Sequence, residues 1–371
     1  MKIMLLILFI SISMSCDRMD QSGQIILETG DSFQVANDMY PEGTVFLVRS
    51  GVHEKQTVRN PKPGNTWIGE TGAIMDGKNE VTEAFLGAAN DITIQGITIR
   101  NYSKNGIHFN SGSNLKLRRV TFEDTGGGTG EVKGAVRLNY IKNITISHST
   151  FKRVTAGILS TDCKGPVTIE WNTAINIGRN FVQLDKCSGN DIKIRYNSME
   201  RQGDYLRGSA HDVVDWISIF KSEGTADNPI MVKYNRARGH GHDDTGSFIM
   251  LGDGGGKHQL ATGNIGVNPG QVGIGIAGGE NIVVRENMMY SNDGWEDSNV
   301  AFYSANYSEP HPCANHEISE NRSFWIKGTL RMQSNVWTDQ RCSPKIENNY
   351  FPDFSINTNI WYNSAAATEN D

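Results

Sequence analysis

Residues 167–172 read VTIEWN and residues 192–197 read IKIRYN. In both stretches two apolar residues flank a single other residue, and an Asn follows three positions after the second apolar residue. Alternation with a period of two is typical of a β-strand that buries one face. Similar runs recur along the chain at residues 92–94, 115–117, 144–146, 230–232 and 282–284.

An Asn follows most of the later runs of this kind, and a Ser takes its place in one of them. These positions are Ser149, Asn172, Asn197, Asn235, Asn264, Asn287, Asn321 and Asn349. The spacing between neighbours ranges from 23 residues, between Asn264 and Asn287, to 38 residues, between Asn197 and Asn235. Self-similarity at such intervals indicates a solenoid rather than several globular domains in series.

Most repeats also contain a second apolar alternation, and none contains an amphipathic helical pattern. Examples of the second alternation are GIHF at 106–109, AVRL at 135–138, FVQL at 181–184 and FIML at 248–251. Short strands in units of this length predict an all-β fold, a parallel β-helix of about ten coils. We expect the Asn side chains to stack at one turn and to form hydrogen bonds along the axis.

These repeats resemble those of the right-handed parallel β-helix proteins of the pectate-lyase-like superfamily. The resemblance extends over about residues 91–351 and depends on the IxIxxN pattern at coil spacing. Members of that superfamily include polysaccharide lyases, hydrolases, epimerases and binding or adhesive proteins, so the resemblance predicts the fold better than the reaction. We divide the chain into an N-terminal segment and cap at 16–64, a β-helix at 65–353 and a frayed polar tail at 354–371.

The first 15 residues have the features of an export signal. Lys2 precedes an apolar run at residues 3–12, which is too short to span a bilayer permanently. The following SMSC resembles a bacterial lipobox, which implies that Cys16 becomes the lipid-modified first residue; an ordinary secretory signal is the alternative. We expect an exported protein, held in the envelope through an N-terminal lipid, on the periplasmic side or at the cell surface, or else secreted.

The four cysteines after Cys16 suit an oxidising compartment. They are Cys163, Cys187, Cys313 and Cys342. In stacked coils the members of each successive pair would lie one strand spacing apart, which is within the Cα distance that a disulfide accepts. We predict the bridges Cys163–Cys187 and Cys313–Cys342, with four buried free thiols as the alternative.

The longest insertions fall in corresponding parts of three coils, at 202–215, 238–247 and 290–299. Loops stacked on one side of a rod form a groove that suits a linear polymer. Two of these loops carry the titratable residues Arg207, His211, Asp212, Asp215, Arg238, His240, His242, Asp243 and Asp244. Carboxylates beside His and Arg suit general acid–base catalysis, and a solvated, salt-bridged loop pair is the alternative.

Strand parity identifies further candidates in WISIFKS at 216–222. With the two Ile residues inside, Trp216, Ser218 and Phe220 point outward and Lys221 begins the turn. FIMLGDG at 248–254 places Asp253 at the equivalent position of the next coil, about one strand spacing from Lys221. Such a Lys is either a catalytic base or the partner of the carboxylate in a salt bridge between stacked coils.

Several residues are candidates for substrate binding. Aromatic rings can stack on sugar faces or fill space under loops, and those near the insertions are Tyr205, Trp216, Phe220, Trp295 and Tyr307. The predicted substrate-binding residues are Arg137, Gln183, Asp185, Arg238, His240, His242 and Trp295.

The resemblance to uronate-cleaving β-helix lyases implies a calcium ion that neutralises the substrate carboxylate. Its candidate ligands are Asp243, Asp244 and Asp253, whereas His240 and His242 give only a weak zinc signal.

We expect a polysaccharide as substrate and a monomeric protein. The chain carries 35 Lys and Arg against 41 Asp and Glu, a net charge of −6, so it lacks the basic excess of a nucleic-acid binder.

The favoured hypothesis is a lyase that cleaves a uronate-containing glycan by β-elimination. Lys221 or His211 would be the base, Arg207 the partner of the substrate carboxylate, and Asp212 or Asp215 an orienting group. The alternatives are a hydrolase that uses the carboxylates of Asp212, Asp215, Asp243 and Asp244, and a surface protein that binds glycan without turnover.

Overall fold

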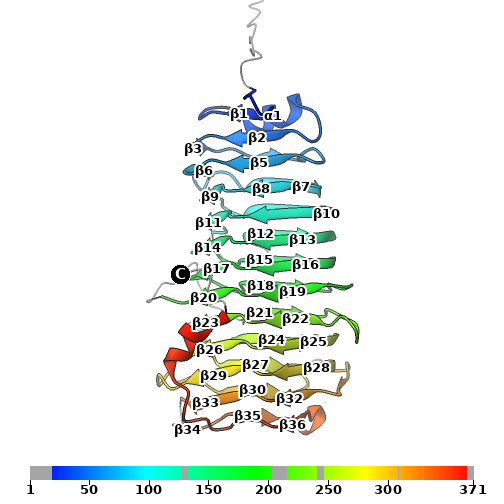
Figure 1. Cartoon of the computed structure of the whole chain (residues 1–371), viewed down its shortest axis with the longest axis vertical. Helices are drawn as coiled ribbons and strands as arrows, with labels where there is room; N and C mark the ends of the chain where they lie inside the picture. Colours follow the sequence, from blue (N-terminus) through cyan, green and yellow to red (C-terminus); the bar gives the residue numbers. More distant parts are fainter. Residues whose placement is uncertain are drawn as a thin grey trace, which may run out of the picture.

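The computed structural model describes residues 19–127, 133–202, 215–239, 246–307, 309–328 and 330–365. Within these ranges the chain winds into about twelve stacked coils of parallel strands (Figure 1). The predicted all-β parallel β-helix is therefore confirmed, with slightly more coils than the ten expected. Regular coils start before residue 65, because β2 (Val45–Val48) and β3 (Gly51–Glu54) already pair with the strands of the next coil. The export signal and Cys16 lie outside the described residues.

Each coil contributes strands to three faces, numbered in the order in which the chain visits them. Face 1 contains β4 (Val58–Arg59), β7 (Glu83–Asn90), the first half of β10 (Asn105–Arg118), β12 (Gly134–Asn139), β15 (Ile158–Thr161), β18 (Val182–Asp185), β21 (Asp215–Phe220), β24 (Ser247–Asp253), β27 (Val272–Ile276), β30 (Val300–Ser304) and β35 (Val336–Thr338).

Face 2 carries the Asn turn at its end and continues the sheet of face 1. It contains β1 (Ile25–Leu27), β2 (Val45–Val48), β5 (Thr66–Gly69), β8 (Thr93–Gln95), the second half of β10, β13 (Ile141–Ser147), β16 (Lys164–Glu170), β19 (Ile192–Arg195), β22 (Ile230–Lys233), β25 (Lys257–Thr262), β28 (Gly279–Arg285), β31 (Cys313–Ala314), β32 (Glu317–Ser319) and β36 (Lys345–Glu347).

Face 3 is a separate sheet, and the long insertions follow it. It contains β3 (Gly51–Glu54), β6 (Ala73–Asp76), β9 (Thr98–Arg100), β11 (Thr121–Glu123), β14 (Thr150–Lys152), β17 (Thr173–Ile175), β20 (Ser198–Glu200), β23 (Arg236–Arg238), β26 (Ile265–Val267), β29 (Met288–Ser291), β33 (Arg322–Lys327) and the antiparallel β34 (Met332–Gln333). All three predicted insertions connect face 3 to face 1, so they emerge at the same corner of successive coils.

The N-terminal end of the core is closed by α1 (Phe33–Met39). Ser32 caps this helix, since its Oγ accepts a hydrogen bond from the Val35 N–H at 3.3 Å. Phe33 is fully buried and stacks on Trp67 with 5.7 Å between ring centroids. The helix thus covers apolar side chains that the first coils would otherwise leave in contact with water.

The Asn residues of the repeat form the predicted ladder inside the turn between faces 2 and 3. The Oδ1 atom of Asn197 accepts from the backbone N–H and from the Nδ2 of Asn172, both at 3.0 Å. Asn197 Nδ2 donates in turn to Asn235 Oδ1 at 2.9 Å, and the same arrangement continues to Asn349. Each amide therefore satisfies buried turn groups of its own coil and of its neighbour.

Both predicted disulfides are confirmed. The Cα atoms of Cys163 and Cys187 lie 4.4 Å apart, and those of Cys313 and Cys342 lie 5.0 Å apart. Each bridge joins one coil to the next, as the stacking predicts.

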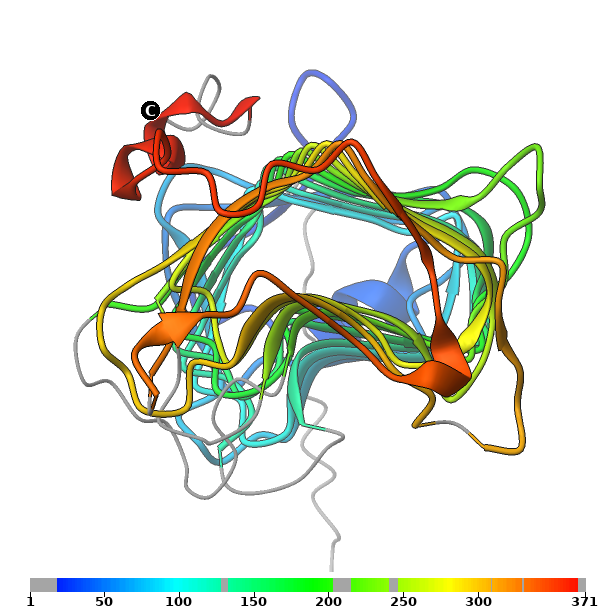
Figure 2. The ribbon, with the colours of Figure 1, turned by 90° about the horizontal axis from the view of Figure 1, so that it is seen from below.

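The prediction of a frayed tail from residue 354 is wrong for its described part. Residues 353–365, here called the C-terminal strap, fold back outside the stacked coils and include η3 (Thr358–Asn363) beside β23 and β26 (Figures 1 and 2). Ile356, Ile360 and Trp361 pack there against apolar side chains of face 3. Apolar burial offsets the chain entropy that would otherwise leave this segment free.

Among the helices that the structure describes, none has the length and apolarity needed to cross a bilayer.

We predict that Asn235→Ala lowers the free energy of unfolding by about 3 kcal/mol, because buried donors of Asn197 lose their acceptor. Denaturant unfolding of the purified protein measures the change. The exposed Asn228 provides the matched control, and Asn228→Ala should change stability by less than about 0.5 kcal/mol. Equal effects of the two substitutions would show that the ladder does not stabilise the stack.

Candidate functional site

One row of side chains runs along the outer side of face 1, in register from β12 to β35. Its members are Arg137, Leu159, Gln183, Ser218, Met250, Gly275, Tyr303 and Trp337. The structure therefore brings Arg137 and Gln183 onto one surface with Ser218, as strand parity predicts. Sequence reasoning missed Met250, Tyr303 and Trp337 in this row.

A second outward row contains Asp185, Phe220 and Asp253 on neighbouring strands. Phe220, and not Lys221, is the cross-strand partner of Asp253, so the predicted Lys221–Asp253 pairing is wrong by one residue. The cause is an extra residue in β24, where Gly252 adopts a φ of +65° and the register shifts. Lys221 still lies beside Asp253, because its backbone N–H donates to the Asp253 carbonyl oxygen at 2.8 Å.

The Lys221 ammonium group is exposed and lies 4.8 Å from the centre of the Phe220 ring. Among the described residues its Nζ has no carboxylate at ion-pair distance. It remains close enough to lower the pKa of both Asp185 and Asp253, which burial raises more strongly. Lys221 is thus a surface cation flanked by two carboxyl groups, available to a ligand.

Two polar groups on this surface are buried without a protein partner in the described chain. They are Asp185 Oδ1 and Arg137 Nη1. Burial lowers the pKa of Arg137 and raises that of Asp185, and each opposes the other's shift through its charge. Buried polar atoms that lack protein partners are candidates for binding a ligand.

Asp215 begins β21 and is 7% exposed. Burial raises the pKa of Asp215 to about 6, and the nearby Asp253 carboxylate contributes to the increase. Its Oδ1 accepts hydrogen bonds from the N–H of Ser247, at 3.1 Å, and from the Ser247 Oγ. A carboxyl group with this pKa can hold or release a proton near neutral pH.

A cavity of about 190 Å³ opens next to this carboxyl group. Its lining residues are Gly246, Ser247, Met250, Gln271, Val272, Asn299, Val300, Tyr303, Tyr307 and Trp337. Burial raises the pKa of Tyr303, and the Asp215 charge adds to the effect. Ser247 joins the cavity to Asp215, so a ligand in the cavity would lie beside a buried acid.

Three predicted binding residues do not contribute to this surface. Arg238 lies on face 3, where it forms an ion pair with Glu200 and its guanidinium group lies 4.6 Å from the Trp361 ring centre. Trp216 is fully buried and its Nε1 donates to the Pro269 carbonyl oxygen at 3.0 Å, so it fills space instead of presenting a ring to solvent. Trp295 is half-buried and does not line the cavity.

Other predicted site residues lie outside the described residues. They are Arg207, His211, Asp212, His240, His242, Asp243 and Asp244, together with Tyr205.

The predicted calcium site is untested, because Asp243 and Asp244 lie outside the described residues. In the described chain the only grouping of three potential metal-binding side chains is Cys313, His316 and Cys342, in which the two sulfurs form a disulfide. Asp253 is the one described member of the predicted calcium set, and a single carboxylate falls short of the six to eight oxygens that calcium takes.

Residues 57–199 match the family model described as "Right handed beta helix region". The match covers less than half of the chain, and together with the stacked parallel coils it supports the fold of a right-handed parallel β-helix. No curated protein matches its sequence.

Solved structures share this fold at low sequence identity. A GH136 lacto-N-biosidase from Eubacterium ramulus aligns with a TM-score of 0.55 and 12% identity, over 86% of this chain and 64% of that one. The alginate lyase AlyF-OU02, in complex with G6, aligns with a TM-score of 0.52 and 13% identity, over 91% and 89% of the two chains. The PL6 alginate lyase AlyGC gives a TM-score of 0.50 and 12% identity, over 89% and 49%.

The β-helix protein described here thus spans less than two thirds of the lacto-N-biosidase chain and about half of AlyGC. At these identities the likeness concerns the fold, and any activity has to be argued from the residues of face 1.

The raised pKa of Asp215 predicts a pH-dependent stability. The folded state binds this proton more tightly than the unfolded chain, whose value is near 3.8, so the free energy of unfolding falls by about 3 kcal/mol as the pH rises from about 4 to about 6. Asp215→Asn removes the titration and should flatten this part of the profile, as measured by denaturant unfolding at several pH values. The exposed control Asp227→Asn should keep the wild-type profile. An unchanged slope in Asp215→Asn would contradict the assignment.

Proposed function

We propose that this β-helix protein is a carbohydrate-active enzyme that binds a polysaccharide along the outer side of face 1. The observation that carries the proposal is the pair formed by the exposed Lys221 and by Asp253, whose pKa burial raises; the Lys221 backbone N–H donates to the Asp253 carbonyl oxygen at 2.8 Å. Proton transfer requires a donor and an acceptor that can change state near the working pH. An extended surface along the coils suits a linear polymer.

Within this class we propose a lyase acting on a uronate-containing glycan. Lys221, in its neutral amine form, takes the proton from the carbon next to the uronate carboxylate, and the electron pair forms a carbon–carbon double bond. The bond to the glycosidic oxygen breaks, and the carboxyl group of Asp253, which lies beside Lys221, donates a proton to that oxygen as it leaves. Asp215 lies at the opposite end of β21 from Lys221, next to the cavity, and has no proton-transfer role in this mechanism.

Substrate binding in this mechanism uses the cations of face 1. Arg137 Nη1 lacks a protein partner in the described chain and can donate to a sugar carboxylate or hydroxyl group. Lys186 adds positive charge beside Asp185. An anionic substrate would form hydrogen bonds with these groups and stabilise their burial.

A hydrolase is the second candidate, and one observation favours it. Asp253 raises the pKa of Asp215, so the two carboxyl groups are close enough to interact. Paired carboxyl groups with different pKa values can serve as acid and base in glycoside hydrolysis. In this case Asp253→Asn would abolish turnover, and the products would carry no new double bond.

Export, lipid attachment at Cys16 and a calcium ion remain proposals for this chain. The described residues hold no complete calcium site, so no step of the mechanism is assigned to a metal.

We predict that Lys221→Ala reduces turnover of a uronate polymer by about 100-fold or more, because it removes the base. Lys221→Arg should be nearly as inactive, since a guanidinium group keeps the charge but does not give up its proton. Formation of the double bond is followed by ultraviolet absorbance. Lys116→Ala, at an exposed position of β10 on face 2, should retain wild-type activity. Substantial activity in Lys221→Arg would assign Lys221 an electrostatic role and would rule it out as the base.

A further inference from the structure

Tyr303 lines the 190 Å³ cavity beside Asp215, and its position depends on a glycine on the neighbouring strand. Gly275 is the residue opposite Tyr303 on the neighbouring strand. A Cβ atom on Gly275 would come within 2.4 Å of the Tyr303 ring, so the missing side chain allows the ring to lie across the strand. The Tyr303 hydroxyl group then reaches Met250 Sδ at 2.9 Å, one coil further along.

The walls of the cavity combine exposed aromatic rings with amides. Tyr307 is 68% exposed and Trp337 is 50% exposed, and both line the cavity. The Tyr303 and Tyr307 rings meet edge to face with 6.0 Å between their centroids. Asn299 and Gln271 supply amide groups at the same site.

None of the residues that line this cavity in the described chain carries a charge. The contrast with the other half of face 1 is clear, because Arg137 and Lys186 lie in coils on the other side of Asp215 along the rod, and Lys221 lies at the far end of the strand that Asp215 begins. Among the described lining residues a carboxylate would meet no cation, and it would lie near the acidic Asp215 and Asp253. An uncharged ligand avoids this repulsion.

We propose that the cavity binds one uncharged sugar ring of the substrate. This inference rests on the proposed function and extends it: the polymer would contain both uronate and neutral residues, with a neutral residue held next to Asp215. Aromatic rings contact the apolar C–H faces of a pyranose, and amides form hydrogen bonds with its hydroxyl groups. The volume suits a single ring rather than a longer segment.

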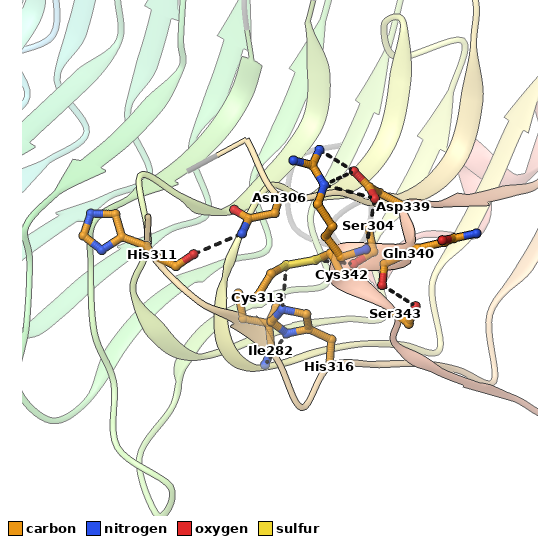
Figure 3. The surroundings of a disulfide bond; sticks show 11 residues. Ile282, Ser304, Asn306, His311, Cys313, His316, Asp339, Gln340, Cys342 and Ser343 are labelled. Atoms are coloured by element: carbon orange, nitrogen blue, oxygen red, sulfur yellow. Dashed lines mark hydrogen bonds and ion pairs between the residues drawn. A yellow bond between two sulfur atoms is a disulfide. The ribbon is translucent and has the colours of Figure 1, made fainter. Parts of the chain in front are cut away.

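The second disulfide ties together the two segments that carry the exposed rings. Tyr307 lies on the connection from β30 to β31, and Trp337 lies on β35, just before η2 (Gln340–Cys342). Cys313 of β31 is bonded to Cys342 of η2 (Figure 3). Asn306 Nδ2 also donates to the His311 carbonyl oxygen at 3.0 Å, which restrains the connection beside Tyr307 (Figure 3). Such restraint reduces the entropy lost when a ligand binds.

The His316 imidazole beside this disulfide forms hydrogen bonds within the protein that do not suit a metal ligand. His316 Nδ1 accepts the backbone N–H of Ile282 at 3.2 Å, and burial lowers the pKa of His316 to about 4, so the ring is neutral with its proton on Nε2. That Nε2–H faces Cys313 Sγ at 3.3 Å. Metal coordination through Nε2 would require the opposite tautomer and would break the bond to Ile282.

The test is a binding measurement that does not depend on turnover. Purified protein is titrated with xylo-, manno-, cello- and galacto-oligosaccharides and with alginate oligosaccharides, using calorimetry. We expect binding of at least one neutral series, weakened tenfold or more in Trp337→Ala and in Tyr307→Ala. Tyr362→Ala is the matched control, since this ring is 65% exposed on the C-terminal strap. Circular dichroism checks that each variant is folded.

Absence of neutral-sugar binding by the wild-type protein would overturn the proposal, and so would equal binding by the wild type and both cavity variants. The double-bond assay separates this result from the fate of the proposed reaction. If binding depends on Tyr307 and Trp337 but no unsaturated product forms from any uronate glycan, the sugar site stands and the lyase reaction fails.

Discussion

The buried amide ladder from Asn172 to Asn349 is the constraint on which the rest of the structure depends. Parallel strands of a solenoid leave turn N–H and C=O groups inside the molecule, where each unpaired group destabilises the fold. The ladder satisfies these groups only when each Asn lies directly above the next, so it sets the register of adjacent coils. Register at this turn then determines which outward residues of face 1 form one row.

Features that repeat were predictable from the sequence, whereas features that occur once were not. The ladder and both disulfides follow from residues that recur at coil spacing, because stacking places such residues together. The extra residue at Gly252 occurs in a single strand, and it shifts Asp253 by one position relative to Lys221. The C-terminal strap gave a weak signal in Ile356, Ile360 and Trp361, yet their partners on face 3 could not be identified without the coordinates.

The site was predictable in its location and only partly in its members. Parity placed Arg137, Gln183 and Ser218 on one surface because these strands keep the regular pattern. Parity failed for Trp216, whose ring fills space by Pro269 at the corner of the coil. Tyr303 and Trp337 lie in coils where insertions obscure the repeat, so their alignment with Met250 emerges only from strand pairing.

The hydrogen bonds at position 215 do not explain why the residue there is Asp rather than Asn. A side chain that only accepted the two hydrogen bonds from Ser247 could be an Asn, as Asn287 is where it accepts from the buried Asn264 N–H. Asp at that position is less favourable, because its negative charge is buried and lies near Asp253. A destabilising carboxyl group beside a solvent-accessible cavity is the pattern expected of a group retained for function rather than for stability. The surrounding ladder and disulfides supply the stability that allows the fold to keep it.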